Sequence, residues 1–254
     1  MEKLKFIGII PARYASSRFP GKPLAMISGK TMIQRVYEQV EKVLSDVYVA
    51  TDDSRISSAV ESFGGKAVMT SDKHRSGTDR CYEAYCNIGS DADVVINIQG
   101  DEPFIHEEQI RGIMDCFGDP ATQIATLVRK FDPKQGFDSL ADSTKPKVVV
   151  DGNRNALYFS RSVIPFVRNA GKEDWASETV FYMHVGMYAY KAEVLAEITK
   201  LPQSPLELAE SLEQLRWLQA GYKIKTGLTD KPTIGIDTPT DLDKAIKYLS
   251  AMEK

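Results

Sequence analysis

The first half of the chain alternates between two patterns of apolar positions. Short apolar runs, such as residues 4–10 and 93–99, have the length and composition of buried strands. Between them lie segments such as residues 31–44, where apolar residues recur every three to four positions, as on one face of a helix. The expected strands are residues 4–10, 46–51, 66–70 and 93–99, and the expected helices are residues 31–44, 54–65, 76–89 and 106–117. This alternation predicts a parallel sheet with helices on both faces.

Beyond about residue 130 the pattern indicates an antiparallel piece. Residues 146–151 and 155–161 are apolar runs joined by turn-forming residues, which predicts a two-stranded unit. We interpret residues 132–145 as a polar connection and residues 168–180 as a variable polar loop. Further strands are expected at residues 123–131, 181–191, 222–228 and 233–236, and further helices at residues 192–200, 205–221 and 238–252.

The simplest architecture is one α/β domain over residues 1–254. Its sheet is expected to be mixed and mostly parallel, flanked by helices, with an antiparallel insertion at about residues 131–190. Neither an internal repeat nor a low-complexity linker is visible in the sequence.

Charge and composition exclude some classes of protein. The 254 residues are 43% hydrophobic and carry a net charge of −3, so no global field would attract nucleic acid. No apolar run approaches the roughly 18 residues of a membrane span, and we expect no membrane insertion. Three cysteines without a CxxC pair are expected to be small buried side chains in a reducing cytoplasm rather than zinc ligands.

Polar residues gather where the predicted strands end. They occupy residues 11–22, 51–53, 71–80, 99–103 and 236–239, each directly after an apolar run. Because ligands of open parallel sheets bind at the carboxyl ends of the strands, these clusters are expected to share one rim.

The first of these loops, "PARYASSRFPGK", brings Arg13, Arg18 and Lys22 together. It is not a P-loop, because Ser16 and Pro23 stand where that motif requires glycine and Ser or Thr, and it lacks GxGxxG. Guanidinium, ammonium and backbone amide donors nevertheless suit a polyphosphate. The alternative is a solvated basic loop stiffened by prolines.

Two carboxylates, Asp101 and Asp237, follow expected strands. Beside a triphosphate they would offer Mg²⁺ the hard oxygen ligands that it prefers. Asp237 could equally cap the last helix. His184, taken alone, fits a buried strand histidine better than a ligand. Since no Ser–His–Asp or Cys–His arrangement stands out, the sequence favours positioning and metal electrostatics, as in phosphoryl transfer.

Seven motifs extend this picture over nearly the whole chain: "IIPARYASSRFPGKPL", "SGTDR", "VINIQGDEP", "ALYFSRSVIP", "HVGMYAY", "PLELAESLEQLRWL" and "IGIDTPTDL". Together they resemble the 3-deoxy-manno-octulosonate (Kdo) cytidylyltransferases, or CMP-Kdo synthetases. The resemblance implies a Rossmann-like nucleotidyltransferase that forms CMP-Kdo and pyrophosphate from CTP and Kdo, for lipopolysaccharide biosynthesis. It also implies Mg²⁺ as cofactor and a homodimer formed through the inserted segment and nearby helices.

The resemblance also implies roles for individual residues. Lys22, Arg13 and Asp101 would be catalytic, and Asp101 and Asp237 would hold the metal. The CTP contacts would be Arg13, Ser16, Arg18, Lys22, Ser76, Arg80 and Gln99, with Ser16 and Arg18 the weaker candidates. The Kdo contacts would be Arg161, His184, Tyr188, Glu210 and Gln214. A sugar acid needs a cation for its carboxylate and mixed donors and acceptors for its hydroxyls, and this set offers both.

Three alternatives can be compared with this interpretation. A cytidylyltransferase for another sugar acid, such as sialic acid or 8-amino-Kdo, would share the first loop and differ on the acceptor side, within residues 184–188 and 204–216. A nucleotide-binding regulator should lack one of the metal carboxylates or Lys22. An NAD-dependent oxidoreductase is disfavoured because the glycine fingerprint is missing.

Overall fold

The computed structural model describes residues 4–15 and 18–252, and its chain forms two compact units. The first unit comprises residues 1–110, 191–199 and 232–254, and the second comprises residues 111–190 and 200–231. The predicted α/β class, with a mixed, mostly parallel sheet flanked by helices, is confirmed.

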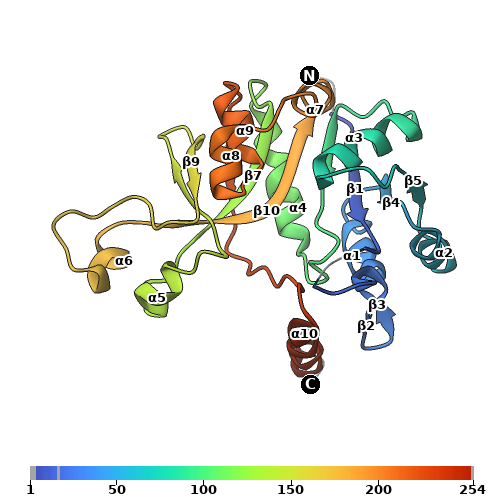
Figure 1. Cartoon of the computed structure of the whole chain (residues 1–254), viewed down its shortest axis with the longest axis horizontal. Helices are drawn as coiled ribbons and strands as arrows, with labels where there is room; N and C mark the ends of the chain where they lie inside the picture. The colour runs from blue at the N-terminus through green and yellow to red at the C-terminus, as the bar shows by residue number, and fades with distance from the viewer. Residues whose placement is uncertain (1–3, 16–17, 253–254) are drawn as a thin grey trace. The chain divides into compact units, whose positions relative to one another are not determined.

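Four parallel strands form the centre of the first unit, in the order β6–β1–β4–β5. Their bounds are Phe6–Ala12 for β1, Val47–Thr51 for β4, Ala67–Met69 for β5 and Val94–Asn97 for β6. The chain winds from β1 outward to β5 and then returns to the other side of β1. With right-handed crossovers this reversal puts α3 on the face opposite α1 and α2, as Figure 1 shows.

The helices of this unit begin where the sequence offers caps. The side chains of Thr31, Asp53 and Ser76 accept backbone hydrogen bonds at the starts of α1 (Met32–Val40), α2 (Ser54–Ser62) and α3 (Gly77–Ile88). The remaining helices are α4 (Glu107–Asp115), which crosses into the second unit, α7 (Ala192–Ile198) and α10 (Pro239–Met252). A small hairpin of β2 (Met26–Ile27) and β3 (Lys30–Thr31) was not expected.

The second unit contains the predicted antiparallel piece. Strand β7 (Ile124–Lys130) pairs in parallel with β11 (Ile224–Leu228) and antiparallel with β10 (Tyr182–Lys191). Strands β8 (Lys147–Val150) and β9 (Ala156–Ser160) form the expected two-stranded unit, and β8 also pairs with β10. A register shift between Val185 and Tyr188 interrupts the ladder of β10 and β7, and such irregularities re-aim side chains.

Three predictions of secondary structure are wrong. Residues 233–236 form no strand; instead, Ile236 is buried beside Ile27 and donates its amide to the carbonyl of Asp101. The helix expected over residues 205–221 is two helices, α8 (Pro205–Glu210) and α9 (Gln214–Gln219), because Ser211 adopts φ 50°. The connection 132–145 contains α5 (Gly136–Leu140).

Residues 168–180 are more ordered in structure than their polar sequence indicates. They contain a 3₁₀ turn at Lys172–Asp174 and the short helix α6 (Trp175–Glu178). Trp175 is buried in a local cluster with Phe131, Leu140 and Phe181. This cluster packs the segment against other residues of the second unit.

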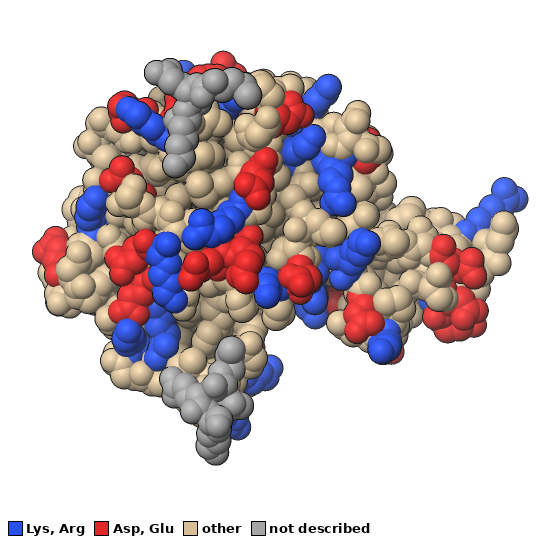
Figure 2. Space-filling model, turned by 180° about the vertical axis from the view of Figure 1, so that it is seen from behind, with Lys and Arg blue, Asp and Glu red and all other residues tan. Residues whose placement is uncertain are grey.

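Basic and acidic side chains alternate over the face shown in Figure 2, in keeping with the small net charge. Cys81 and Cys116 are buried as expected, whereas Cys86 is exposed, which corrects the prediction for that residue. Within residues 4–15 and 18–252, none of the helices is long and apolar enough to cross a membrane.

Candidate active site

The first unit contains a cavity of about 260 Å³ at the carboxyl ends of β1 and β6. This is the point where the winding of the parallel strands reverses, and it is the place where such sheets bind ligands. Eight predicted nucleotide and metal positions line it: Arg13, Arg18, Lys22, Ser76, Arg80, Gln99, Asp101 and Asp237. Ser16, the ninth, lies outside the described residues. The structure therefore brings these positions together, while their individual roles stay predictions.

Two glycines allow the loops of the cavity to take their shapes. Gly21 has φ 71°, a conformation that glycine adopts without strain, and it starts the 3₁₀ turn Lys22–Leu24 that carries the lysine. A Cβ on Gly100 would lie 3.0 Å from the carbonyl oxygen of Pro11, so the loop after β6 approaches the end of β1 closely. These contacts place Asp101 next to the loop that follows β1.

The ammonium group of Lys22 lies between the two predicted metal carboxylates. Its Nζ is 2.7 Å from Oδ2 of Asp101 and 3.2 Å from Oδ1 of Asp237, and the lysine side chain is only 15% exposed. Arg18 adds a longer ion pair of 3.3 Å to Asp237. The two carboxylates thus converge on a single cation position.

Asp237 is not the cap of the last helix. The residue before α10 that accepts the first-turn amide is Thr238, whose Oγ1 accepts from the amide of Asp241 at 3.2 Å. Asp241 returns the contact by accepting from the amide of Thr238 at 3.1 Å. The carboxylate of Asp237 is therefore available to the cavity, which removes the alternative that the sequence left open.

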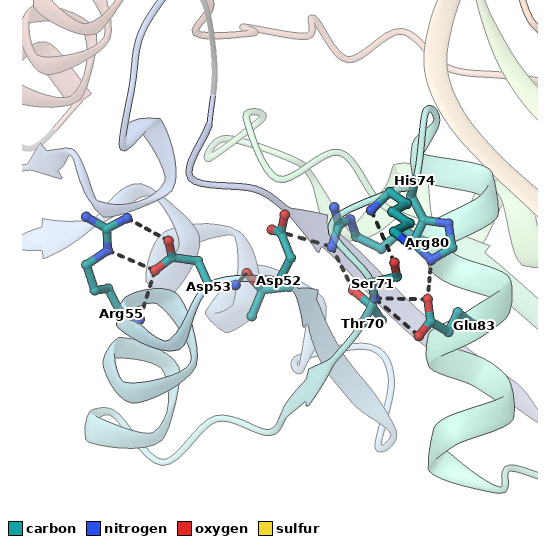
Figure 3. Close-up of polar contacts among 10 residues, drawn as sticks. Asp52, Asp53, Arg55, Thr70, Ser71, His74, Arg80 and Glu83 are labelled. Carbon is teal, nitrogen blue, oxygen red and sulfur yellow. Dashed lines mark hydrogen bonds and ion pairs between the residues drawn. The ribbon is translucent and has the colours of Figure 1, made fainter.

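Arg80 is anchored beneath the cavity from two sides. Its Nη1 donates to Oγ1 of Thr70 at 2.7 Å and lies 3.5 Å from Oδ1 of Asp52, as Figure 3 shows. Ser76 caps α3 by accepting from the amide of Asp79 at 3.1 Å. Arg80 is 4% exposed, so its guanidinium is held as a fixed part of the wall.

The cavity also contains a residue to which sequence reasoning gave no role. His74 lines it two residues before Ser76, and its ring is bound to Glu83. The signal in the sequence was its position directly before "RSGTDR", in the polar cluster of residues 71–80.

Glu102, the neighbour of Asp101, has an unusual acidity. Burial and the adjacent charge of Asp101 raise the pKa of Glu102 to about 7. A carboxyl group with this pKa is partly protonated near neutral pH.

The predicted Kdo contacts lie in the second unit and form two groups. In the first, the rings of His184 and Tyr188 on β10 are 5.3 Å apart, and Tyr188 packs edge-on against Trp217. Nε2 of His184 is 3.0 Å from Oγ1 of Thr126. Burial lowers the pKa of His184 to about 4, so its ring is neutral at pH 7.

Four buried side-chain atoms among the described residues of this unit lack hydrogen-bond partners. Two of them belong to predicted Kdo contacts, and the other two are Nε of Arg216 and Nε1 of Trp217. Among the described residues, neither the hydroxyl of Tyr188 nor Nε2 of Gln214 makes a hydrogen bond of ordinary geometry. Both side chains are buried, at 8% and 4% exposed. A buried donor without a partner costs about 1–3 kcal/mol, so such atoms suit a polar ligand.

The second group is a network around Glu210. Its carboxylate accepts from Oγ of Ser160 at 2.6 Å and from the amide of Arg161 at 2.9 Å. The guanidinium of Arg161 donates to the carbonyls of Glu210, Ser143 and Ser211 at 2.6, 2.9 and 3.3 Å. Because a guanidinium carries five N–H groups, two of them are not accounted for by these bonds.

Comparisons with known proteins agree with this geometry. The model of the family "Cytidylyltransferase" matches residues 7–224. A protein of Bacteroides thetaiotaomicron named 3-deoxy-manno-octulosonate cytidylyltransferase is 65% identical, over 97% of this chain and 98% of its own. One of the same name from Phocaeicola vulgatus is 63% identical, over 98% of this chain and 99% of its own.

A solved structure adds the fold. CMP:2-keto-3-deoxy-manno-octonic acid synthetase complexed with CTP matches with a TM-score of 0.89 and 44% identity, over 98% of this chain and 99% of that one. The fold, with cations and carboxylates gathered at the strand ends, is that of a nucleotidyltransferase. Within this class, the chain belongs to the cytidylyltransferase family and, at this identity, to its 3-deoxy-manno-octulosonate cytidylyltransferases.

Proposed function

We propose that this chain activates Kdo for lipopolysaccharide biosynthesis by transferring CMP from CTP to its 2-hydroxyl group, with release of pyrophosphate. The observation that carries the proposal is the cavity of the first unit. In a chain 65% identical to a named Kdo cytidylyltransferase, this cavity gathers Arg13 and Lys22 with two convergent carboxylates.

Mg²⁺ fits the residues of this cavity. The ammonium group of Lys22 lies within 3.2 Å of both Asp101 and Asp237, at the position where the two carboxylates could bind a metal ion. Two carboxylate ligands, with phosphate and water for the rest, are what Mg²⁺ uses in nucleotide enzymes. Asp101 and Asp237 would hold the ion, which would lower the pKa of the attacking hydroxyl and stabilise charge on the α-phosphoryl group.

The remaining residues of the cavity bind and orient. Lys22, once released from the two carboxylates, would turn to the phosphates together with Arg13 and offset charge on the leaving pyrophosphate. Arg80, held by Thr70 and Asp52, would form a rigid wall for the cytidine. Such preorganisation lowers the entropic cost of aligning the α-phosphorus with its attacker.

The acceptor residues suit a sugar acid. The two N–H groups of Arg161 beyond its carbonyl bonds suit the carboxylate, and the buried donors of Tyr188 and Gln214 suit hydroxyl oxygens. His184 is neutral and bound to Thr126, so we assign it a contact and not proton abstraction.

The test is pyrophosphate release with CTP and a panel of sugar acids, with and without Mg²⁺. Release is expected with Kdo and Mg²⁺ and should be at least about tenfold slower with N-acetylneuraminic acid, a free-energy difference of ~1.4 kcal/mol. A preference for N-acetylneuraminic acid or 8-amino-Kdo would identify the alternative acceptor. Binding of CTP without release, with every acceptor, would instead indicate a nucleotide-binding regulator.

We also propose that the protein is a homodimer formed through the inserted segment and acts in the cytoplasm, where CTP is supplied. Three large apolar side chains of that segment lie on its surface. Phe166 is 73% exposed, Leu157 58% and Val180 51%. Exposed apolar groups gathered on one segment are typical of an interface, and a second copy of the chain would cover them.

A further inference from the structure

We propose that His74 is a further nucleotide contact of the cavity, accepting a hydrogen bond from the cytidine at Nδ1, and that Glu83 is its positioning residue. This inference rests on the proposed function, because it names a second contact for the same CTP. It concerns a residue of the polar cluster 71–80 to which the sequence motifs assigned no role.

His74 lies in the wall of the cavity that is next to the cytidine contacts. It belongs to the loop of residues 70–76 between β5 and α3, and Ser76 and Arg80 follow it in the chain. His74, Ser76 and Arg80 all line the same cavity. The side chain of His74 is 19% exposed, so it is partly covered and still reachable from the cavity.

Glu83 fixes this loop at two places. Its carboxylate accepts two hydrogen bonds from the amide of Ser71, at 3.0 and 3.2 Å, and a further one from Nε2 of His74. Figure 3 shows the ring of His74 and the backbone amide of Ser71 in contact with Glu83 on α3. One turn earlier on the same helix, Arg80 holds Thr70, so α3 anchors the loop at its start and at its middle.

The contact with Glu83 requires a proton on Nε2 of His74. Although burial opposes ionisation, the hydrogen bonds from Ser71 and His74 lower the pKa of Glu83, so its carboxylate is an acceptor. Nε2 of His74 must then be the donor. In the neutral ring this leaves Nδ1 with a lone pair, and it can only accept.

A cytidine offers donors that match such an acceptor. Its base carries an exocyclic amino group and its ribose carries hydroxyl groups, whereas the phosphates of CTP carry only acceptor oxygens at neutral pH. Arg13, Arg18 and Lys22 already supply cations for the phosphates. A hydrogen-bond acceptor in the same cavity therefore matches the donors of the nucleoside and not the phosphate oxygens. An orienting partner behind a histidine is the usual way in which proteins fix its tautomer.

The test compares two substitutions that keep different parts of the ring. His74→Gln places its amide near the position of Nε2, so it keeps the contact with Glu83 and loses the acceptor at Nδ1. His74→Asn places its amide oxygen near Nδ1 and loses the contact with Glu83. The dissociation constant of CTP is measured by calorimetry with Mg²⁺, and that of inorganic tripolyphosphate serves as the reference.

His74→Gln is expected to weaken CTP binding about tenfold and to leave tripolyphosphate binding within about twofold, because one hydrogen bond to the nucleoside is lost. His74→Asn should lose less of the affinity for CTP than His74→Gln does. Lys73→Ala, an exposed neighbour that does not line the cavity, is the matched control and should bind CTP like the parent chain.

The role of Glu83 is tested by a double-mutant cycle. Glu83→Gln should weaken CTP binding severalfold in the parent chain but add little to His74→Gln, since both changes act through the same nitrogen. The KM for Kdo should stay unchanged in all variants, which a general loss of structure would not allow.

The outcomes separate this inference from the proposed function. If the parent chain binds CTP and His74→Gln binds it equally well, His74 is not a contact and the inference is wrong. An equal loss for CTP and tripolyphosphate would also overturn it, because the loop would then act on the phosphates. Failure of the parent chain to bind CTP would contradict the proposed function itself.

Discussion

Nζ of Lys22 lies 2.7 Å from Oδ2 of Asp101, although 78 residues separate them in the chain. The loop after β1 and the loop after β6 meet at this contact because the two strands are parallel neighbours. An ion pair between a predicted phosphate ligand and a predicted metal ligand means that one must release the other when Mg²⁺ and CTP bind.

Asp101→Asn should reduce turnover at least ~10²-fold at saturating Mg²⁺ and CTP, the scale of losing a preorganised electrostatic group. The substitution keeps the size of the side chain and removes the charge that holds the cation. Steady-state pyrophosphate release measures the effect. Asp243→Asn, on the exposed side of α10, is the control and should retain full activity. Near-normal turnover of Asp101→Asn would refute the metal assignment.

Lys22→Ala should raise the KM for CTP far more than the KM for Kdo, because the lysine serves the phosphates. An increase of tenfold or more for CTP is expected from the loss of a charge-assisted hydrogen bond of ~1.5–3 kcal/mol. Both constants come from the same kinetic series. Equal losses for the two substrates would contradict a phosphate role for the loop.

The positions of these groups show how far the sequence alone leads. Clusters after the expected strands predicted that Arg13, Gln99 and Asp101 share a rim, because parallel strands end at the same edge. The sequence could not decide whether Asp237 binds a cation or caps a helix, since both uses suit an aspartate before Thr-Pro. The reciprocal contact of Thr238 and Asp241 settles the cap.

The wrong predictions of secondary structure have a similar origin. Thr233, Ile234 and Ile236 are β-branched, as strand residues often are, but residues 233–236 form no strand. Ile236 is instead buried with residues of the hairpin and of two helices, namely Ile27, Met32 and Ala245. In the segment 205–221 the helical period is continuous, and a left-handed Ser211 has no signature in sequence. Such features depend on tertiary contacts, which local propensity does not contain.

His184 should make the stability of the protein depend on pH. Burial lowers its pKa from 6.5 to about 4, so the unfolded chain binds a proton between these values that the folded chain does not. The contribution of neutral His184 to the free energy of unfolding is therefore fully present above pH 6.5, and it is lost as the pH is lowered towards 4. By linkage the loss between pH 7.5 and pH 5 is about 2 kcal/mol.

Urea unfolding of the parent chain and of His184→Gln at the two pH values measures this loss. The difference between the two proteins isolates His184, because Glu102, whose raised pKa gives the opposite slope between pH 4.5 and 7, is common to both. If the parent and the variant lose stability in parallel, His184 is not buried in its neutral form.

Phe166→Asp should convert the proposed dimer into monomers, because it puts a charge into the apolar surface of the inserted segment. Light scattering after size exclusion should give about twice 28.3 kDa for the parent chain and 28.3 kDa for the variant. Met26→Asp, at an exposed apolar position of the first unit, should leave the dimer intact. A monomeric parent chain at micromolar concentration would contradict the dimer.

Formation of the nucleotide sugar is the most direct measure of the central claim. The parent chain is incubated with CTP, Kdo and Mg²⁺, and the products are followed by ³¹P NMR and mass spectrometry. The account predicts a phosphodiester of CMP on the 2-hydroxyl of Kdo, formed in equal amount with pyrophosphate and absent when Kdo is omitted. Pyrophosphate without CMP-Kdo, or no conversion of CTP with Kdo while another sugar acid is converted, would contradict it.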